Sequence, residues 1–279
     1  MSIVNAFNQM VENSAKTITK NDSDYTGENG LLYCGKCNTP KQTKITVLGK
    51  EYYPYCICKC EEERLNKEEA ERKQREFAEK VKDLRKTGFP DKEMLQWTFA
   101  NDDMENEQIT KAMKRYVENF PELKKQGKGL LLYGNVGRGK TYAACEVANA
   151  LIDKGYSVLV TNFARIVNTL QGTFEKQEYI DSLNDFSLLV IDDLSAERDT
   201  TFMKEQIFQV VDARYKANLP MIITTNLSLD EIKKTNDLEY SRIYDRIIEK
   251  CFPIEVKGQN RRYKAVRESY GDMKELLGL

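Results

Sequence analysis

The chain has 279 residues, with 43 lysines and arginines against 44 aspartates and glutamates, seven cysteines and no histidine. This length is enough for one large domain or two unequal ones. The lack of histidine excludes Ser-His-Asp and Cys-His nucleophile systems, histidine-ligated metals and an imidazole pH switch. Proton transfer would fall to carboxylates, lysine, tyrosine or water, and a zinc site would need thiolates or carboxylates.

The bulk properties predict a soluble, polar globular protein. Charged residues make up 31% of the chain and hydrophobic residues 41%, with a mean hydropathy of −0.61. No apolar run approaches the roughly 18–20 residues that span a bilayer, and Met1–Glu12 lacks the features of a secretion signal. We therefore expect a cytoplasmic protein without a membrane partner, in which the cysteines stay reduced.

The N-terminal part of the chain contains a short helical pattern and then a cysteine cluster. The helical pattern is an apolar face formed by Ile3, Val4, Phe7, Met10 and Val11. Cys34 and Cys37 form a C-x₂-C knuckle around a glycine, and Cys56, Cys58 and Cys60 follow about twenty residues later. Four thiolates would close a structural zinc site and leave one of these five cysteines spare. The residues between, Lys41–Tyr55, are predicted to form a small hairpin.

A highly charged helix is predicted next, from Glu61 to Lys86. These 26 residues include nine acidic and nine basic side chains and contain no glycine or proline. Glutamates precede lysines or arginines by four residues in five places, which is the favourable order on a helix: Glu63/Lys67, Glu68/Arg72, Glu69/Lys73, Glu71/Arg75 and Glu76/Lys80. Only Phe77, Val81 and Leu84 form an apolar edge, so we expect a solvated, semi-rigid connector that docks near its end. Gly88-Phe89-Pro90 closes the helix.

The remainder of the chain alternates short apolar runs with helical patterns. The predicted strands are Gly129–Tyr133, Ser157–Thr161, Leu188–Ile191, Met221–Thr224 and Phe252–Val256, with helices such as Lys140–Lys154 and Thr201–Lys216 between them. Continuous rather than alternating apolar strands, separated by helices, are typical of a buried parallel sheet. The fold class is therefore α/β, with five strands in the core.

A phosphate-binding loop follows the first of these strands. The residues Gly134, Asn135, Val136, Gly137, Arg138, Gly139, Lys140 and Thr141 match G-x-x-x-x-G-K-[ST], between a predicted strand and a predicted helix. Such a loop turns backbone N–H groups toward phosphates at the positive end of a helix. Lys140 would reach the β- and γ-phosphates of ATP, the Thr141 hydroxyl would ligate Mg²⁺, and Tyr142 lies beside them. The alternative is a glycine-rich turn without a ligand.

Two further strand ends carry polar residues suited to ATP hydrolysis. Asp192 and Asp193 end the strand that begins at Leu188, where Asp192 would hold Mg²⁺ and Asp193 would polarise the attacking water. Asn226 follows the next strand and could orient that water. Each has a simpler alternative, because acids at a strand end often cap a helix and asparagine often forms a turn.

Together these motifs resemble those of AAA+ ATPases. The phosphate loop, the I-D-D-L segment (Ile191–Leu194) and the T-T-N strand end (Thr224–Asn226) are most similar to the DnaC/DnaI-type replicative helicase loaders and the related IstB transposition ATPases. The resemblance covers roughly Phe99–Tyr263. It implies an AAA+ P-loop core with a five-stranded parallel sheet and a reduced C-terminal lid, because only 23 residues (Lys257–Leu279) follow the last predicted strand.

The resemblance also assigns arginines and zinc ligands. Arg242 would be an arginine finger reaching the γ-phosphate of a neighbouring subunit, with Arg246 as its reserve and a surface ion pair as the alternative for both. Arg262 would be the sensor-2 arginine that contacts the nucleotide, with Arg261 as the alternative. Loaders of this type have a C-x-C before a charged helix, so the implied zinc ligands are Cys34, Cys37, Cys58 and Cys60, with Cys56 as an alternate. Cys145 and Cys251 are predicted to be core residues.

The resemblance implies three regions and a function. Residues 1–60 would bind zinc and a DnaB-type replicative helicase, residues 61–87 would be the linker, and residues 88–279 would be a self-associating AAA+ ATPase that uses ATP/ADP and Mg²⁺. The protein would help place the helicase on single-stranded DNA, with slow hydrolysis. DNA would contact Asn162–Phe186, where a core role is the alternative for the candidate side chains Phe163, Arg165, Phe174, Lys176 and Tyr179. The alternative functions are an IstB-like transposition ATPase and a non-hydrolysing nucleotide-binding adaptor.

Overall fold

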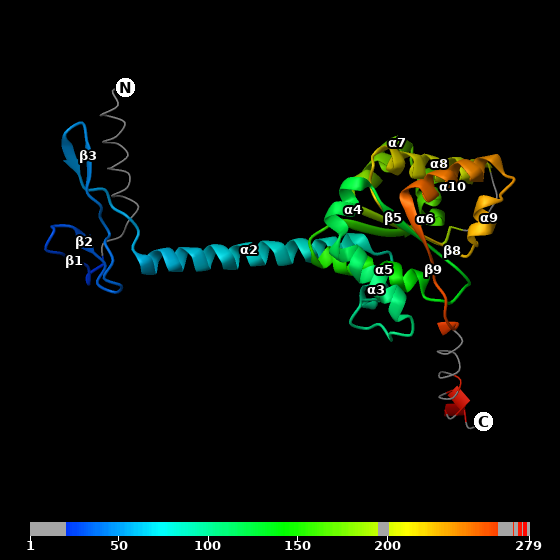
Figure 1. The fold of residues 1–279 in the computed structure, drawn as a ribbon, viewed down its shortest axis with the longest axis horizontal. Helices are drawn as coiled ribbons and strands as arrows, with labels where there is room; N and C mark the ends of the chain where they lie inside the picture. The colour runs from blue at the N-terminus through cyan, green and yellow to red at the C-terminus, as the bar shows by residue number, and fades with distance from the viewer. Residues whose placement is uncertain (1–20, 195–200, 262–269, 271–272, 275, 278–279) are drawn as a thin grey trace. The chain divides into compact units, whose positions relative to one another are not determined.

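A computed structural model describes residues 21–194, 201–261, 270, 273–274 and 276–277 (Figure 1). The helix predicted from Ile3 to Val11 and the candidate sensor Arg262 lie outside these residues. The chain divides into two compact units, residues 1–78 and 79–279, and the division falls within one long helix. No helix in the described ranges is long and apolar enough to cross a bilayer.

The first unit contains two small antiparallel sheets. Strands β1 (Tyr25–Thr26) and β2 (Leu32–Tyr33) pair with each other, and β3 (Ile45–Val47) and β4 (Lys50–Tyr52) form a hairpin within the predicted range. The hairpin turn uses Leu48 and Gly49, both at positive φ, a backbone conformation that glycine adopts without cost. Lys41 is 3% exposed and forms an ion pair of 2.7 Å with Asp24, which joins the segment before the hairpin to the segment before β1.

Helix α2 (Lys59–Gly88) contains the whole predicted charged segment. Of the five acid-first pairs expected on it, Glu69–Lys73 forms an ion pair of 2.6 Å, while Arg64–Glu68 and Arg72–Glu76 pair with the base first. All these side chains are exposed, so the pairs contribute little stability each. Val81 and Leu84 pack against the core of the second unit, whereas Phe77 is 46% exposed. The predicted apolar edge is therefore wrong at Phe77, because docking begins one turn later.

The second unit contains a five-stranded parallel sheet in the order β6-β7-β8-β5-β9. Its strands are β5 (Gly129–Tyr133), β6 (Val158–Asn162), β7 (Leu188–Asp192), β8 (Met221–Thr225) and β9 (Cys251–Glu255). They lie within one residue of the predicted runs and confirm the α/β class. Three strands are apolar along nearly their whole length because they have neighbours on both sides and helices on both faces.

Helices cover both faces of the sheet (Figure 1). One face packs against α3 (Glu107–Glu118), α4 (Phe120–Gln126) and α5 (Lys140–Asp153). The other packs against α6 (Phe163–Gly172), α7 (Lys176–Ser182), α8 (Thr201–Lys216), α9 (Leu229–Lys233) and α10 (Leu238–Lys250). The described residues of this unit also include the 3₁₀ helices η1 (Lys92–Gln96) and η2 (Leu183–Asp185). Polar residues cap the helices where the sequence changes direction, for example Asn162 before α6 and a Ser228–Glu231 capping box at α9.

One buried arginine ties the second face together. Arg214 of α8 is fully buried and donates to the carbonyl oxygens of Leu183 (3.1 Å), Phe186 (2.8 Å) and Pro220 (2.6 Å). Burial lowers the pKa of the guanidinium to about 10, which leaves it charged at neutral pH. Arg214 thus fixes the loops that enter β7 and β8, and those two strands carry the polar residues of the site described next.

Candidate nucleotide and metal sites

The predicted phosphate loop connects β5 to α5 at the carboxyl end of the sheet, where ligands bind in open α/β sheets. Gly134, Gly137 and Gly139 all have positive φ (133°, 79° and 91°), a conformation that side chains rarely adopt. The first turn of α5 begins at Lys140, so the open N–H groups of the helix start face the loop. A cleft of about 600 Å³ opens here, large enough for a nucleotide.

Lys140 is held in place by three acceptors. Its Nζ donates to the carbonyl oxygens of Gly134 (2.7 Å) and Asn135 (2.9 Å) and to the Oδ1 of Asn226 (2.7 Å). Lys140 is only 7% exposed, so its ammonium group is held away from solvent. The structure therefore brings Lys140 and Asn226 together, although they lie 86 positions apart in the chain.

The end of β7 places the two aspartates in different surroundings. Asp192 accepts two hydroxyl hydrogen bonds at Oδ1, from Thr141 (2.8 Å) and from Thr224 (2.6 Å). Asp193 lies at a positive φ of 55°, which turns the chain sharply as the strand ends. Its N–H donates to the Thr224 hydroxyl (2.9 Å), and its Oδ1 accepts from the Asn226 amide (3.2 Å).

This geometry fits a magnesium nucleotide. Thr141 and Asp192 present a hydroxyl and a carboxylate to one point, which are the hard oxygen donors that Mg²⁺ prefers. Asp193 and Lys140 share Asn226 as a common partner, so the candidate base and the candidate phosphate-binding cation are positioned by one side chain. The predicted roles of these residues remain predictions, but their proximity is a property of the fold.

Thr224 has a role that sequence reasoning did not assign. It was noted only as part of the T-T-N strand end, yet its hydroxyl contacts both Asp192 and the N–H of Asp193. It is 1% exposed. A buried threonine at the end of an apolar strand, beside a strand that ends in two acids, is the signal that could have revealed it.

Arg261, the predicted alternative sensor, lies against the phosphate loop. The backbone N–H of Arg261 donates to the Gly137 carbonyl (2.9 Å), and its guanidinium is 5.8 Å from the ring centre of Tyr142. A Cβ at Gly139 would be 3.3 Å from the guanidinium carbon, so glycine permits this approach. Asp103 (3.1 Å) and Asp102 (3.7 Å) pair with the same guanidinium. The sequence did not predict a site role for either aspartate, because two acidic residues before a helix usually interact with the start of that helix.

A buried carboxyl group lies beside this ion pair. Glu146 of α5 is 2% exposed, and its Oε1 has no hydrogen-bond partner among the described residues. Burial first, and then the nearby Asp102, raise the pKa of Glu146 to about 8, against the opposing effect of Arg261. One turn earlier on α5, Tyr142 stacks on Trp97 with ring centres 5.8 Å apart. Trp97 also lines the cleft.

The two candidate finger arginines lie on α10, and neither lines this cleft. Arg246 forms an ion pair of 2.6 Å with Asp212 and lies over the Phe208 ring. Burial opposes ionisation of Asp212, but hydrogen bonds from Lys216 and Arg246 hold the pKa of this carboxyl below its usual value. Arg242 is exposed, lies 4.7 Å from the Phe208 ring centre, and has no acidic partner in the part of the chain that the structure describes. Arg242 is therefore more exposed than Arg246, and its role as a finger remains a prediction.

The candidate DNA segment consists of α6, α7 and η2, and its aromatic residues divide into two groups. Phe163 is 3% exposed and Tyr179 packs against the core, so the stacking role predicted for Phe163 is wrong. Phe174 is fully exposed. The two cationic side chains of this segment are exposed and have different partners. Arg165 lies 3.6 Å from Asp91, and Lys176 lies over the Phe202 ring.

In the first unit, the structure brings four cysteine thiols together. The sulfurs of Cys34, Cys37, Cys58 and Cys60 all lie within 4.8 Å of one another, with 3.6 Å between Cys34 and Cys60 and 3.4 Å between Cys58 and Cys60. A tetrahedral zinc with Zn–S bonds of 2.3 Å places its sulfurs about 3.8 Å apart, so this donor set fits zinc. A hydrogen bond with the Thr39 hydroxyl (3.1 Å) lowers the pKa of the Cys37 thiol.

The other cysteines lie apart from this cluster. Cys56 instead donates to the Pro40 carbonyl (3.4 Å), and burial raises the pKa of its thiol. Cys145 and Cys251 are buried in the second unit, as expected for core residues.

Comparison with known proteins supports the nucleotide site. The model of the IstB-like ATP binding protein family matches residues 57–269, which is most of the chain and includes the loop, β7 and β8. The chain belongs to this family. The AAA+ fold and ATP binding follow from the family and from the geometry together.

Curated proteins similar to this chain include replicative helicase loaders. Over 204 residues the chain is 28% identical to the replicative helicase loader DnaI of Bacillus subtilis, covering 66% of this chain and 64% of DnaI. It is 29% identical over 139 residues to the replicative helicase loader DnaC of Escherichia coli K12, covering 48% of this chain and 54% of DnaC. A crystal structure of DnaI superposes with a TM-score of 0.52 and 27% identity, covering 63% of this chain and 95% of that one. The chain thus spans between half and two thirds of the length of these two curated relatives.

Proposed function

We propose that the protein is an ATP-dependent loader that binds a DnaB-type replicative helicase and helps place it on single-stranded DNA. The observation that carries this proposal is the similarity to DnaI over 204 residues, because a protein of that name is a helicase loader and the matched length is enough to include a whole AAA+ core. The chain also has the four-thiol cluster and the charged helix that the resemblance to loaders implies, and they favour a loader over a transposition ATPase.

The residues at the carboxyl end of the sheet have the chemistry that ATP hydrolysis needs. Lys140 would stabilise the negative charge on the phosphates, and Thr141 with Asp192 would hold Mg²⁺. Asp193, positioned by Asn226 and by Thr224, would accept a proton from the attacking water. Because no histidine is available, a carboxylate is the natural group for this step.

Arginines would make the site responsive to assembly. Arg242 would reach the site of a neighbouring copy, since it is exposed and does not line the cleft of its own chain. An arginine keeps its charge in such a setting and so stabilises a phosphoryl transition state without any proton transfer. Arg262 would serve as sensor 2, with Arg261, which lies against the phosphate loop, as the alternative. Turnover would then be slow until helicase and DNA are bound.

The N-terminal residues 1–60 would contact the helicase, with zinc stabilising their fold, and residues 61–87 would link them to the ATPase. Zinc is proposed as a structural ion because the four thiols use every position of a tetrahedral site and leave none open for substrate. The exposed Phe174 and Lys176 would contribute to DNA binding, one by stacking and one by charge.

A loading assay on circular single-stranded DNA tests the proposal. The full-length chain, its Lys140→Ala variant and the surface control Lys125→Ala are each mixed with a DnaB-type helicase, and unwinding of an annealed oligonucleotide is followed. The wild type and the Lys125 variant should accelerate unwinding, and the Lys140 variant should not. Failure of the wild-type chain to bind the helicase would overturn the loader assignment, whereas equal activity of Lys140→Ala would favour a non-hydrolysing adaptor.

A further inference from the structure

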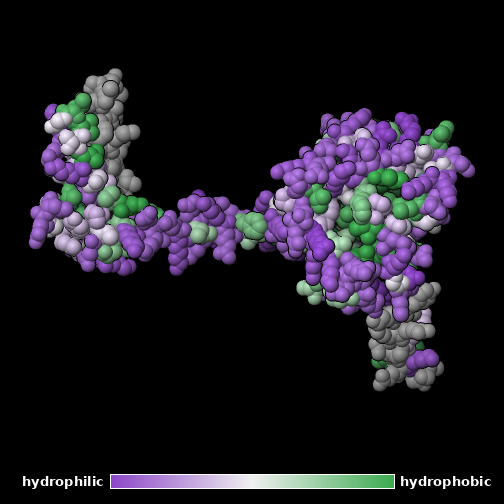
Figure 2. All heavy atoms as spheres, viewed as in Figure 1, coloured by the Kyte–Doolittle hydropathy of each residue, from purple (hydrophilic) through white to green (hydrophobic). Residues whose placement is uncertain are grey.

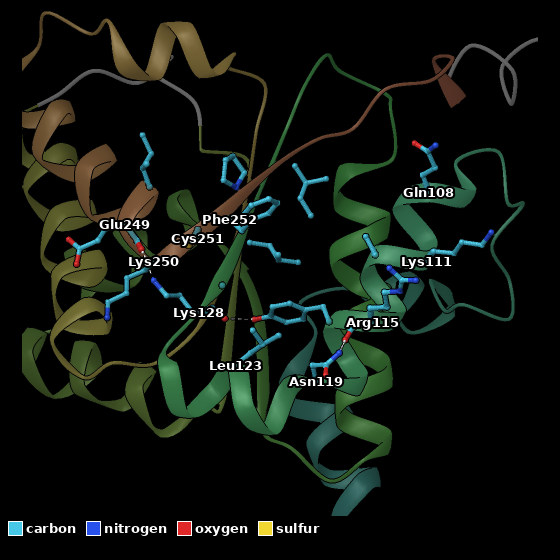
Figure 3. A pocket seen from close by; sticks show the side chains of 17 residues that line it. Gln108, Lys111, Arg115, Asn119, Leu123, Lys128, Glu249, Lys250, Cys251 and Phe252 are labelled. Atoms are coloured by element: carbon cyan, nitrogen blue, oxygen red, sulfur yellow. Dashed lines mark hydrogen bonds between the residues drawn. The ribbon is translucent and has the colours of Figure 1, made fainter.

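A second hollow, separate from the nucleotide cleft, lies at the open edge of the sheet. It has a volume of about 870 Å³ and is bounded by α3, α4, the last turn of α10 and β9 (Figure 3). Its floor is formed by buried groups such as Tyr116 and Leu130, and its wall includes the half-buried Ile254 and the exposed Phe252. Figure 2 shows hydrophobic side chains gathered on the face where β9 runs in Figure 1. We refer to this hollow as the β9 groove.

The β9 groove exists because the helices cover β5 but not its neighbour. Leu130 of β5 and Phe252 of β9 are paired in register, so their side chains lie on the same face of the sheet. Leu130 is 6% exposed beneath α3 and α4, whereas Phe252 is 69% exposed. An aromatic ring left this open beside a hollow is the feature that marks interaction sites on protein surfaces.

The strand edge itself is unsuited to pairing with another strand. The backbone N–H of Val256 donates to the carbonyl oxygen of Tyr133 in β5 (2.8 Å). Because directions alternate along a strand, every second residue before Val256 also points its N–H toward β5. Pro253 lies three residues before Val256, so its nitrogen points the opposite way, toward the open edge of the sheet. Proline has no N–H to donate, which is a common way to block strand addition at an edge. A partner must therefore bind through its side chains rather than its backbone, as a helix lying in the groove would.

The charges around the β9 groove select an acidic partner. Arg115, Lys128 and Lys250 line it, and the two lysines contact neutral groups: Lys128 donates to the Glu249 carbonyl and Lys250 to the Asn218 side chain. Glu249 is the acidic residue that lines the groove, and both its carboxylate oxygens accept from the Tyr215 hydroxyl (2.8 Å), outside the lining. The rim is therefore net positive.

The ends of this chain do not match that rim. Residues 1–20 contain two lysines and one glutamate, and residues 262–279 contain four basic and three acidic side chains. Neither segment has an excess of acidic side chains that the basic rim would attract. We propose that the β9 groove binds an acidic amphipathic helix of a partner protein, with its apolar side on Phe252 and Ile254 and its carboxylates at Arg115 and Lys128.

A defined peptide tests this proposal on the full-length chain. The probe is a labelled 15-residue helix with leucine at spacings of three and four and glutamate on the remaining faces, and its affinity is measured by fluorescence anisotropy. Phe252→Ser and Arg115→Glu should each weaken binding at least tenfold. The matched controls Leu238→Ser and Lys125→Glu, which change an exposed apolar side chain and a surface charge outside the groove, should leave affinity unchanged.

The remaining outcomes decide against the proposal. Equal affinity of the wild type and both groove variants, or equal binding of a peptide with lysine in place of glutamate, would overturn it. A lower mass of the Phe252→Ser chain in solution would also overturn it, because the groove would then join two copies of this chain. Each variant is first compared with the wild type by thermal melting, and Arg115→Glu keeps the test decisive if Phe252→Ser is unstable. Helicase loading is not involved, so failure here is distinct from failure of the loader function.

Discussion

Replacement of Glu146 by glutamine should stabilise the second unit at alkaline pH and leave it nearly unchanged in acid. The carboxyl group is buried, and its pKa rises from 4.5 to about 8 in the folded chain. Between these two values the unfolded chain carries the ionised group and the folded chain binds a proton. The wild type therefore loses stability as pH rises from about 4.5 to about 8, and changes no further above that.

The size of this effect follows from the shift. One pKa unit is worth about 1.4 kcal/mol, which sets an upper limit of about 4–5 kcal/mol above pH 8. Relaxation of the protein around a buried charge reduces the cost below this limit, so we expect about 2 kcal/mol at pH 8. At pH 5 the expected difference is below about 1 kcal/mol.

Urea unfolding measures this difference directly. Trp97 is the single tryptophan and packs in the second unit, so its fluorescence reports that unit alone. Curves for the wild type, Glu146→Gln and the exposed control Glu118→Gln are compared at pH 5 and pH 8. The reasoning fails if Glu146→Gln shows the same pH dependence of unfolding as the wild type, or if Glu118→Gln reproduces its effect.

Two further predictions concern the candidate sites. Cys56→Ser should keep one zinc ion per chain, whereas Cys58→Ser should lose it and destabilise the first unit; metal analysis of the purified chains checks this, and equal loss in both variants would contradict the cluster. Thr224→Val removes the hydroxyl that contacts Asp192 and the N–H of Asp193, so ATP turnover should fall roughly tenfold or more while nucleotide affinity changes little. Turnover at the wild-type rate would show that Thr224 has no positioning role.

The sequence predicted the strands to within one residue because each is a continuous apolar run between clear helical patterns. It also predicted which polar residues follow β5, β7 and β8, and parallel strands bring such residues to one edge of a sheet. What it could not provide was strand order. Phe252–Val256 was read as part of a buried sheet, yet β9 is an edge strand, so Phe252 is exposed and borders a groove.

The contacts between distant segments were also beyond the sequence. The residues around Arg261 do not predict its ion pairs with Asp102 and Asp103, which lie more than 150 positions earlier and hold it against the phosphate loop. The cysteine cluster left five candidates for four places, and resemblance alone chose among them. The fold separates Cys56 by hydrogen-bonding it to Pro40, a contact that depends on how the hairpin folds back.

The most direct test of the account is ATP turnover and ATP binding measured side by side for the wild type, Lys140→Ala and Asp193→Asn, with helicase and single-stranded DNA present. We predict that Asp193→Asn binds ATP as tightly as the wild type and hydrolyses it about a hundredfold more slowly, because only the water-activating group is lost. Lys140→Ala should fail to bind. A wild-type chain that binds ATP without hydrolysing it, or an Asp193→Asn variant that turns over at the wild-type rate, would contradict the account.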